Sequence, residues 1–341
     1  MALTFVADLI PYESYLRTGY IESLDYNVNI LNAGSVGTVK LESELTTGFK
    51  KNEAFFEDFG KISRRDVTVD TDQTSHKIER NEHTAFKTFW KFEPVEWTWT
   101  AFKTADNMSN EEVMYLVGKK LAEKKVEYTV NQAITVACAA IGSVAEMNVD
   151  SSSKNISVMD ILKAKQRFGD QASKLRALIM HSASFYTMVG DQMLNSKYTL
   201  GEGLMMYGGY PATGGLPVIV TDNPELIVSG EGANAVYRTL ALTDNAVILK
   251  DNGNTQFAMN TVTGKENLKN IFQGEGDMWN YVKGYQLKST IGNNPSDVEL
   301  ANTANWEKWV KSNKDTAGVV IKAKADLDSV QQITYVKQIT D

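Results

Sequence analysis

The sequence has very few of the side chains that disulfide-bonded proteins and metalloenzymes depend on. Its 341 residues include one cysteine, Cys138, and three histidines, His76, His83 and His181. A single cysteine excludes an intrachain disulfide and a cysteine-rich zinc site. Cys138 lies in the apolar run "AITVACAAIGSV", so we interpret it as a core side chain rather than a catalytic thiol. The spacing of His76 and His83 fits no usual metal motif, and we expect both on a solvated surface rather than in a metal site.

The sequence also lacks a long hydrophobic run. No stretch of about 18 apolar residues is present, so we expect no membrane-spanning helix. The N-terminal segment "MALTFVADLIPYESYL" has no basic start and is interrupted by Asp8 and Pro11. It therefore does not fit a secretory signal peptide, and we expect the protein in a cytosol-like compartment.

An excess of positive charge is missing as well. The chain has 35 basic and 42 acidic residues, for a net charge of -7. This balance argues against broad binding to DNA phosphates, which needs a cationic surface. The hydrophobic fraction of 43% is ordinary for a globular protein with one elaborate domain or two. No Walker A, H-E-x-x-H or G-x-S-x-G motif occurs.

Aromatic residues are concentrated in residues 63–104, where the sequence alternates. Trp90 and Phe92 lie two positions apart, as do Trp97 and Trp99. A period of two is typical of strands, and the very polar centre of the segment predicts a turn. We expect a long two-stranded ribbon. Because such a ribbon is barely stable alone, its aromatic side chains are expected to contact something outside it.

A long helix is predicted over residues 109–141. Ser109 and Glu112 form a capping box, and Gly142 is a natural stop. Gly118 weakens the helical pattern slightly. At 1.5 Å per residue the helix would be roughly 50 Å long, which indicates an architectural role. Residues 1–60, in contrast, show little periodicity and predict an extended arm with at most one short helix.

The remaining sequence mixes helices and strands without a repeating order. "SSSKN" (151–155) is interpreted as a linker, and Ser157 opens a helix that reaches Phe168. Strands are expected in "VIVTD", "YRTLAL", "NAVILK" and "AGVVIKAKADL", and helical pieces in "ENLKNIFQ" and "NPSDVELANTANWEKWVK". The irregular spacing favours an α+β fold over a βαβ series.

One segment matches a dinucleotide-binding motif in part. Gly230, Gly232 and Ala235 form G-x-G-x-x-A, and Asp251 ends a later strand. The motif needs a helix N-terminus to bind phosphate, but the residues that follow alternate like a strand. We therefore favour a glycine turn, and a nucleotide-binding enzyme remains an alternative.

A second enzyme-like feature is the pair His181 and Ser182, between a predicted strand and a predicted helix. A catalytic triad would also need an acid and an oxyanion hole, and adjacent residues project in different directions. Ser182 or Ser184 as the N-cap of the helix accounts for the same residues. We predict a capping turn.

The segment "KLRALIMHSASFYTMV" also resembles a motif in major capsid proteins of tailed bacteriophages. The glycine-rich "GYPATGGLPVIVTDNPE" and the strand pair "YRTLALTDNAVILKDNG" look like the next parts of those proteins, in the same order. The resemblance covers about residues 60–325. It implies a Hong Kong 97-like capsid fold with an N-terminal arm (1–60), an extended β-hairpin E-loop (61–104), a peripheral domain with a spine helix (105–150), an axial domain (151–300) and a return to the peripheral domain and C-terminus (301–341).

This resemblance implies a structural protein and not an enzyme, with no catalytic, metal or cofactor residues. It would self-assemble into hexamers and pentamers of an icosahedral phage head in the host cytoplasm and become part of the virion capsid. Implied partners are packaged double-stranded DNA bound without sequence specificity, a portal, a separate scaffolding protein and a decoration protein. The residues expected to contact a neighbouring subunit are Trp90, Phe92, Trp97 and Trp99. An encapsulin-like compartment shell is the alternative with the same fold.

Overall fold

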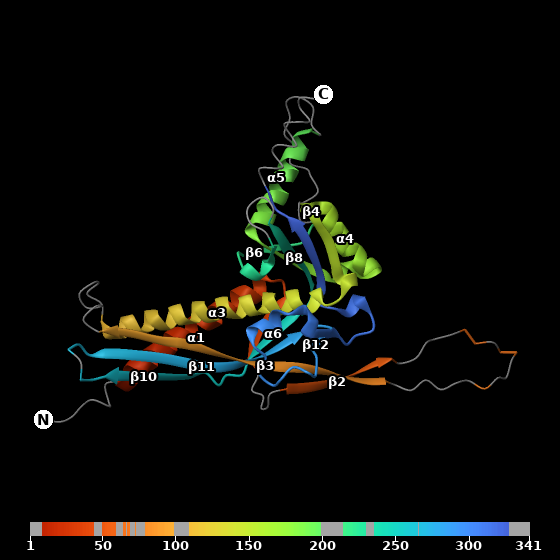
Figure 1. The fold of residues 1–341 in the computed structure, drawn as a ribbon. Helices are drawn as coiled ribbons and strands as arrows, with labels where there is room; N and C mark the ends of the chain where they lie inside the picture. The colour runs from red at the N-terminus through yellow and green to blue at the C-terminus, as the bar shows by residue number, and fades with distance from the viewer. Residues whose placement is uncertain are drawn as a thin grey trace.

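The computed structural model describes residues 9–43, 50–58, 64–65, 67–68, 72, 79–98, 109–198, 214–229, 235–264 and 266–326. Figure 1 shows a long sheet layer with two helices lying along it, and a smaller unit of sheet and helices standing above one part of that layer. Helices and strands alternate irregularly along the chain, as an α+β fold requires. The sequence prediction of the fold class is therefore confirmed.

The long layer is an eight-stranded sheet. Its central strand is β11, which pairs with β3, β9, β10 and β12, and the sheet therefore joins segments that are far apart in the sequence. The strands are β1 (Val39–Ser43), β2 (Lys50–Asp58), β3 (Glu79–Thr98), β9 (Val247–Asp251), β10 (Gln256–Val262), β11 (Lys269–Val282), β12 (Tyr285–Leu287) and β13 (Trp306–Lys308).

The smaller unit is built on a six-stranded sheet. Its inner strands β5, β8 and β14 are buried on nearly every residue, which matches their almost continuous apolar sequences. The strands are β4 (Asn148–Asn155), β5 (Leu175–Met180), β6 (Val218–Val220), β7 (Ile227–Ser229), β8 (Val236–Thr243) and β14 (Gly318–Lys324). The helices α4 (Val158–Phe168) and α5 (Ser182–Tyr198) belong to this unit (Figure 1).

Several short helical turns connect these parts. They are η1 (Ala145–Met147), η2 (Gly169–Lys174), η3 (Pro224–Leu226), α6 (Asp297–Ala301), η5 (Thr303–Asn305) and η6 (Asn313–Asp315). Gly169 caps α4 with a φ of 56°, a conformation that glycine adopts without strain. The predicted helix from Ser157 to Phe168 is confirmed.

The predicted long helix is present as α3 (Asn110–Gly142), 33 residues long. Ser109 accepts the backbone N–H of Glu112, and the Glu112 carboxylate accepts the backbone N–H of Ser109. This reciprocal pair satisfies two of the donors that a helix start leaves free. The capping box and the stop at Gly142 were both correctly predicted from local sequence.

The N-terminal arm differs from the prediction of an extended segment. Residues Leu9–Gly34 form the helix α1, which lies beside α3 along the long sheet (Figure 1). Leu16 and Tyr20 are buried in this contact. Packing against α3 and the sheet stabilises this helix. The weak hydrophobic pattern of its own sequence does not predict that packing.

Two local interpretations were wrong. The "SSSKN" segment is the end of strand β4 and not a linker, because β14 offers it a parallel partner, with Val149 opposite Ile321. The segment "ENLKNIFQ" contains the start of strand β11 and not a helix, because β3 and β10 pair with it on its two edges. In both places tertiary pairing overrides local propensity.

The two sheets also divide the chain differently from the expected domain limits. Residues 151–300 contribute β5 to β8 to the six-stranded sheet but β9 to β12 to the eight-stranded sheet. Within 301–341, β14 lies inside the six-stranded sheet between β4 and β8, whereas β13 belongs to the other one. Each unit is therefore assembled from separate parts of the chain.

Candidate functional site

The aromatic residues of β3 lie against a glycine-containing part of β11. Trp90 stands opposite Gly276 and Phe92 opposite Gly274. A Cβ atom on Gly276 would lie 2.4 Å from the Trp90 ring, and one on Gly274 would lie 2.9 Å from the Phe92 ring. The two glycines thus leave the space that these two aromatic rings occupy.

The same rings are covered by the two long helices and by β10. The Tyr20 ring of α1 meets the Phe257 ring edge-on at 5.0 Å, and Trp90 meets Phe92 at 5.2 Å. Trp97 packs in a cluster with Leu16, Val113, Met114 and Phe272. The expected pairing of two strands within residues 63–104 is wrong: β3 is one strand, and its partners among the described strands are β2, which precedes residue 63, and β11. The aromatic side chains of β3 are covered by other parts of the same chain.

The exposure of the four residues expected at a subunit interface shows which of them are buried within one chain. Trp90 is 7% exposed and Trp97 is 8% exposed, so both are core residues of one chain. Phe92 is half-buried, and Trp99 lies outside the described residues. A contact between these residues and a neighbouring subunit stays a prediction.

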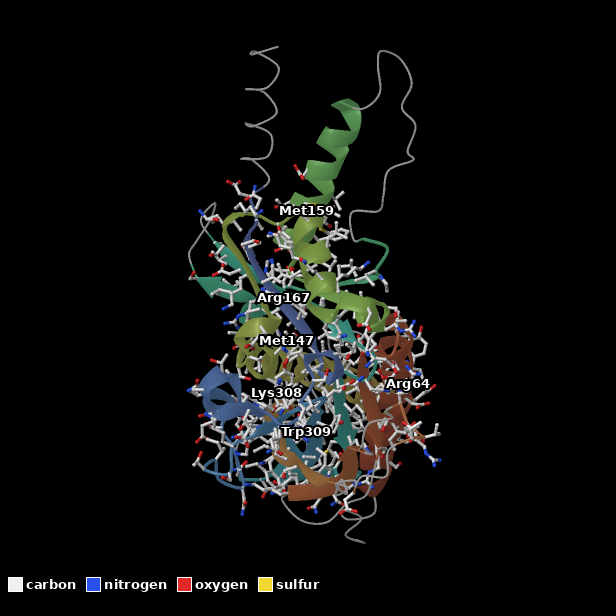
Figure 2. All side chains as sticks on the ribbon, turned by 90° about the vertical axis from the view of Figure 1, so that its right-hand side faces the viewer. Arg64, Met147, Met159, Arg167, Lys308 and Trp309 are labelled. Carbon is white, nitrogen blue, oxygen red and sulfur yellow. The ribbon has the colours of Figure 1, made fainter. Side chains whose placement is uncertain are left out.

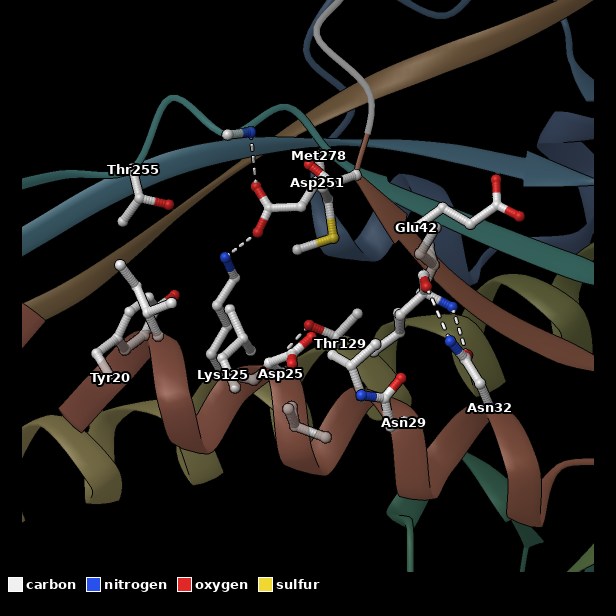
Figure 3. Close-up of a pocket in the computed structure, with 18 of the residues that line it drawn as sticks. Tyr20, Asp25, Asn29, Asn32, Glu42, Lys125, Thr129, Asp251, Thr255 and Met278 are labelled. Atoms are coloured by element: carbon white, nitrogen blue, oxygen red, sulfur yellow. Dashed lines mark hydrogen bonds and ion pairs between the residues drawn. The ribbon is translucent and has the colours of Figure 1, made fainter. Parts of the chain in front are cut away.

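A buried ion pair lies beneath the aromatic cluster. The Lys125 ammonium of α3 pairs with the Asp251 carboxylate at the end of β9 (Figure 3). The Nζ atom of Lys125 also lies 4.4 Å from the centroid of the Trp90 ring. Burial lowers the pKa of Lys125, although the charge of Asp251 opposes the change. Burial raises the pKa of Tyr20, with a further contribution from Asp251.

These groups line a cavity of about 580 Å³ between α1, α3 and the sheet (Figure 3). Across the cavity, the Asn32 side chain exchanges two hydrogen bonds with the backbone of Leu41, at 2.9 and 3.0 Å. Asn32 thereby fixes the end of α1 to β1. The polar groups described here hold elements together, and none of them is arranged around a reacting atom.

Two further polar groups connect β3 to other parts of the chain, one through Lys87 and the other through Thr88. Lys87 pairs with Asp277, which also accepts the Asn252 amide at 2.9 Å. The hydroxyl of Thr88 accepts the amides of Gln132 and Asn280 at 2.9 and 2.8 Å. Sequence reasoning missed both groups, because their members come from four distant segments and have no common motif.

The nucleotide-binding alternative lacks the helix on which it depends. Gly230 and Gly232 lie outside the described residues, but Ala235 leads directly into strand β8. A strand offers no helix N-terminus for a phosphate group. Asp251, the proposed ribose-binding acid, is engaged with Lys125. The expectation of a strand after the glycine turn is confirmed.

His181 and Ser182 form a capping turn, but the cap is the histidine and not a serine. The Nδ1 atom of His181 accepts the backbone N–H of Ala183 at 3.2 Å, and Nε2 lies 3.6 Å from Asp222. A hydrogen bond from Ser182 holds the pKa of Asp222 below its usual range. The Ser182 hydroxyl thus donates to the Asp222 carboxylate. A catalytic triad requires instead that a histidine ring nitrogen accept the serine proton, and neither nitrogen of His181 is placed to do so.

The remaining sequence candidates are inert or lie outside the described part. Cys138 is buried, and burial raises the pKa of its thiol to about 12, which keeps it protonated and unreactive. His76 lies outside the described residues, as does the side chain of His83. Within the described ranges no three His, Cys, Asp or Glu residues form a group that could hold a metal ion.

Comparison with known proteins identifies the family of this chain. A family model for the major capsid protein 13-like (Gp13-like) family matches residues 8–320. The chain belongs to this family of major capsid proteins. The capsid protein is thus a shell protein of an icosahedral phage head, and its place is the virion capsid. Its family is one of structural proteins rather than enzymes.

Solved structures agree with this capsid protein in fold. The capsid of Ralstonia phage GP4 is similar with a TM-score of 0.53 at 8% identity, over 85% of this chain and 87% of that one. The capsid asymmetric unit of cyanophage Pam1 is similar with a TM-score of 0.51 at 11% identity, over 84% and 88% of the two chains. The capsid protein therefore has the Hong Kong 97-like fold. No curated protein matches it in sequence. In the described part, no helix is long and apolar enough to cross a membrane.

Proposed function

We propose that the capsid protein assembles into hexamers and pentamers that together close the head around double-stranded DNA. One observation carries the proposal, namely the ribbon of β2 and β3. The residues of β3 from 86 onward pair with β11, whereas residues 79–85 pair only with β2 among the described strands. Figure 1 shows this ribbon running past the end of the long layer. Because two strands alone are barely stable, it gains stability by lying on a neighbouring subunit.

We further propose that the two sheets correspond to the two capsid domains. The eight-stranded sheet with α1 and α3 forms the peripheral domain, and the ribbon is its E-loop. The six-stranded sheet with α4 and α5 forms the axial domain, which points to the centre of each hexamer or pentamer. This assignment follows the two sheets, each of which combines separate segments of the chain, and it therefore replaces the continuous residue ranges expected from the sequence.

The partners follow from the proposed role. A portal and a separate scaffolding protein would take part in assembly in the host cytoplasm, and a decoration protein would bind the finished shell. The DNA is enclosed without sequence specificity. The net charge of -7 fits a container that surrounds DNA without clasping it tightly.

Electron microscopy of the purified protein tests the proposal directly. The chain is expressed alone and with a scaffolding protein, and closed shells with six-fold and five-fold clusters are expected in at least one preparation. A monodisperse monomer under every condition would contradict it.

Limited trypsin digestion tests the role of the ribbon. Arg64 and Arg65 are exposed between β2 and β3, and Figure 2 shows Arg64 at the margin of the molecule. Lys87 resists cleavage, because it is buried in its ion pair with Asp277. The free subunit should be cut first at Arg64 or Arg65, and assembled shells should be protected there. Equal cleavage rates in both forms would show that the ribbon does not lie on a neighbour.

A further inference from the structure

We propose that a groove between α3, η3 and α6 binds the outer face of helix α4 from a second copy of the chain, with Arg167 of that helix facing the carboxylates of the groove. This inference rests on the proposed function, because it assigns a contact between subunits of the assembled shell. The groove has a volume of about 620 Å³ and is lined by side chains of these three elements and the residues beside them.

The groove has an apolar rim. Val298 of α6 is 80% exposed, and Tyr128 of α3 is 37% exposed. Pro224 of η3 lines the same groove. Apolar side chains that gather around one groove, unlike single ones scattered over a surface, indicate a contact with another molecule.

The groove also carries negative charge. The carboxylates of Glu225 and Asp297 line it, and no lysine or arginine is among its described lining residues. Burial raises the pKa of Tyr128, and the charge of Asp297 adds to the rise. Arg238 contacts η3 from β8, where its guanidinium donates to the backbone oxygen of Glu225 at 3.0 Å. With this guanidinium counted, the two carboxylates still leave an excess of negative charge.

Helix α4 presents a complementary surface. Met159 and Leu162 lie three positions apart on its outer face and are 59% and 39% exposed. Arg167, near the end of the helix, is exposed and forms no ion pair or hydrogen bond with another described residue. Figure 2 shows Met159 and Arg167 on the same side of the smaller unit. A permanent cation beside two apolar side chains matches a groove with carboxylates and an apolar rim.

The lysines around α4 are already engaged. Lys163 pairs with the buried Asp160 carboxylate at 2.9 Å, and Lys154 lies 3.9 Å from the same carboxylate. The Lys165 ammonium donates to a backbone oxygen at 2.7 Å. Arg167 is therefore the cation of this flank whose donors are available to a partner.

The carboxylate that shares a hollow with Arg167 is that of Asp150. It accepts the backbone N–H of Ser152 at 3.0 Å, and this bond lowers its pKa, with a smaller contribution from Lys322. Two carboxylates on this flank, Asp150 and Asp160, stand against four cations, Lys154, Lys163, Lys165 and Arg167. The flank therefore has an excess of two positive charges, opposite in sign to the groove.

The two surfaces lie at opposite sides of the subunit. Helix α4 contacts β4 at one edge of the six-stranded sheet, and η3 follows β6 at the other edge. Figure 1 shows α4 and β6 on opposite sides of the smaller unit. A contact between two different surfaces repeats from copy to copy and can close a ring. A second copy is thus the favoured occupant, whereas the carboxylates of the groove would repel DNA phosphates.

Charge exchange across the contact tests the inference. Arg167→Glu should lower the assembled fraction by about tenfold or more, because a carboxylate then faces carboxylates, and Asp297→Lys should act in the same direction. The chain with both changes pairs the exchanged charges between copies and should recover most of the assembly. Arg176→Glu is the matched control at another exposed arginine of the smaller unit, and it should assemble like the unchanged protein.

The unfolding temperature of each free subunit separates assembly from folding. All variants should unfold at the temperature of the unchanged subunit. If Asp297→Lys unfolds earlier, because Asp297 also begins α6, Glu225→Lys takes its place as the groove variant.

Cysteine cross-linking then tests the geometry of the contact. Leu162→Cys and Val298→Cys are combined in one chain, in which the native Cys138 is buried. A short bis-maleimide should join neighbouring copies in assembled shells into covalent rings of five and six chains on a denaturing gel. Each single variant should remain uncrosslinked. Shells that yield only dimers, or no cross-link, would overturn the head-to-tail contact.

The outcomes separate this inference from the proposed function. If the unchanged protein forms no shells, the proposed function fails. If Arg167→Glu assembles as well as the control does, only this inference fails. If the groove variant blocks assembly and the exchanged pair does not recover it, the groove binds a basic segment other than α4, and the inference is wrong.

Discussion

Gly118 of α3 lies directly against the backbone oxygen of Leu16 in α1. A Cβ atom at Gly118 would lie 2.2 Å from that oxygen, and one at Gly19 would lie 2.4 Å from the oxygen of Tyr115. The two glycines face each other where the helices cross. Sequence alone suggested only that Gly118 weakens its helix, whereas the structure shows that no larger residue fits there.

Replacing Gly118 with alanine should destabilise the subunit. Alanine favours an isolated helix by about 1 kcal/mol, but forcing α1 away from α3 costs about 1–3 kcal/mol, and we expect the second effect to dominate. Urea unfolding of the free subunit measures the difference. Gly34→Ala is the matched control, because a Cβ there meets nothing within 4 Å. A more stable Gly118→Ala protein would show that the helices separate without cost.

Replacing Trp90 with serine should impair folding of the subunit itself. Its ring lies between Gly276 and the Lys125 ammonium, and truncating a buried tryptophan costs about 3–5 kcal/mol. Val95→Ser on the same strand is the control, because Val95 is exposed. The thermal midpoint should fall only for Trp90→Ser. Loss of assembly at an unchanged midpoint would instead place Trp90 at a subunit interface.

Replacing Lys125 with methionine should lower the free energy of unfolding of the subunit, because the Asp251 carboxylate then lies beside the aromatic residues without its positively charged partner. Lys125 is 5% exposed, and breaking a buried pair costs about 3–5 kcal/mol; since Asp251 is partly exposed, we expect the lower end of that range. Asp251→Asn and the double variant complete a double-mutant cycle, with a coupling energy of about 1–3 kcal/mol expected. Strictly additive losses of unfolding free energy would mean that the pair contributes no net interaction.

The stability of the smaller unit should fall in acid through Asp160. Burial raises the pKa of this carboxyl, but hydrogen bonds from Ser151, Lys163 and Ser157 outweigh burial and hold it below its usual range. The folded pKa is thus lower than the unfolded value of about 3.9, so the stabilisation is complete above that pH. It is lost as the pH falls through the folded pKa.

Urea midpoints measured between about pH 3 and pH 6 check this prediction. The unchanged protein should lose stability toward the acid end, and Asp160→Asn should show a flatter profile at a lower overall stability, because the amide cannot replace the charge. Identical slopes for both proteins would assign the acid sensitivity to other carboxyls.

The sequence by itself determined the elements whose signals are local. The capping box of Ser109 and Glu112 specifies the start of α3, because both partners lie within one helical turn. The apolar runs of β5, β8 and β14 predict buried strands. The order of these parts along the chain was sufficient to indicate the capsid fold, and the alternation of residues 236–243 predicted the strand that follows Ala235.

Only the tertiary structure decided which distant residues meet. Tyr20 of α1 covers Phe92, and this helix was missed because it depends on packing against α3, where Leu16 meets Gly118. Lys40, Lys51 and Lys250 come from three strands and line one hollow of the sheet, and no local spacing relates them. The physical reason is that strand pairing depends on partners far away in sequence. A shift of one residue in register would move every one of these side chains to the other face of the sheet.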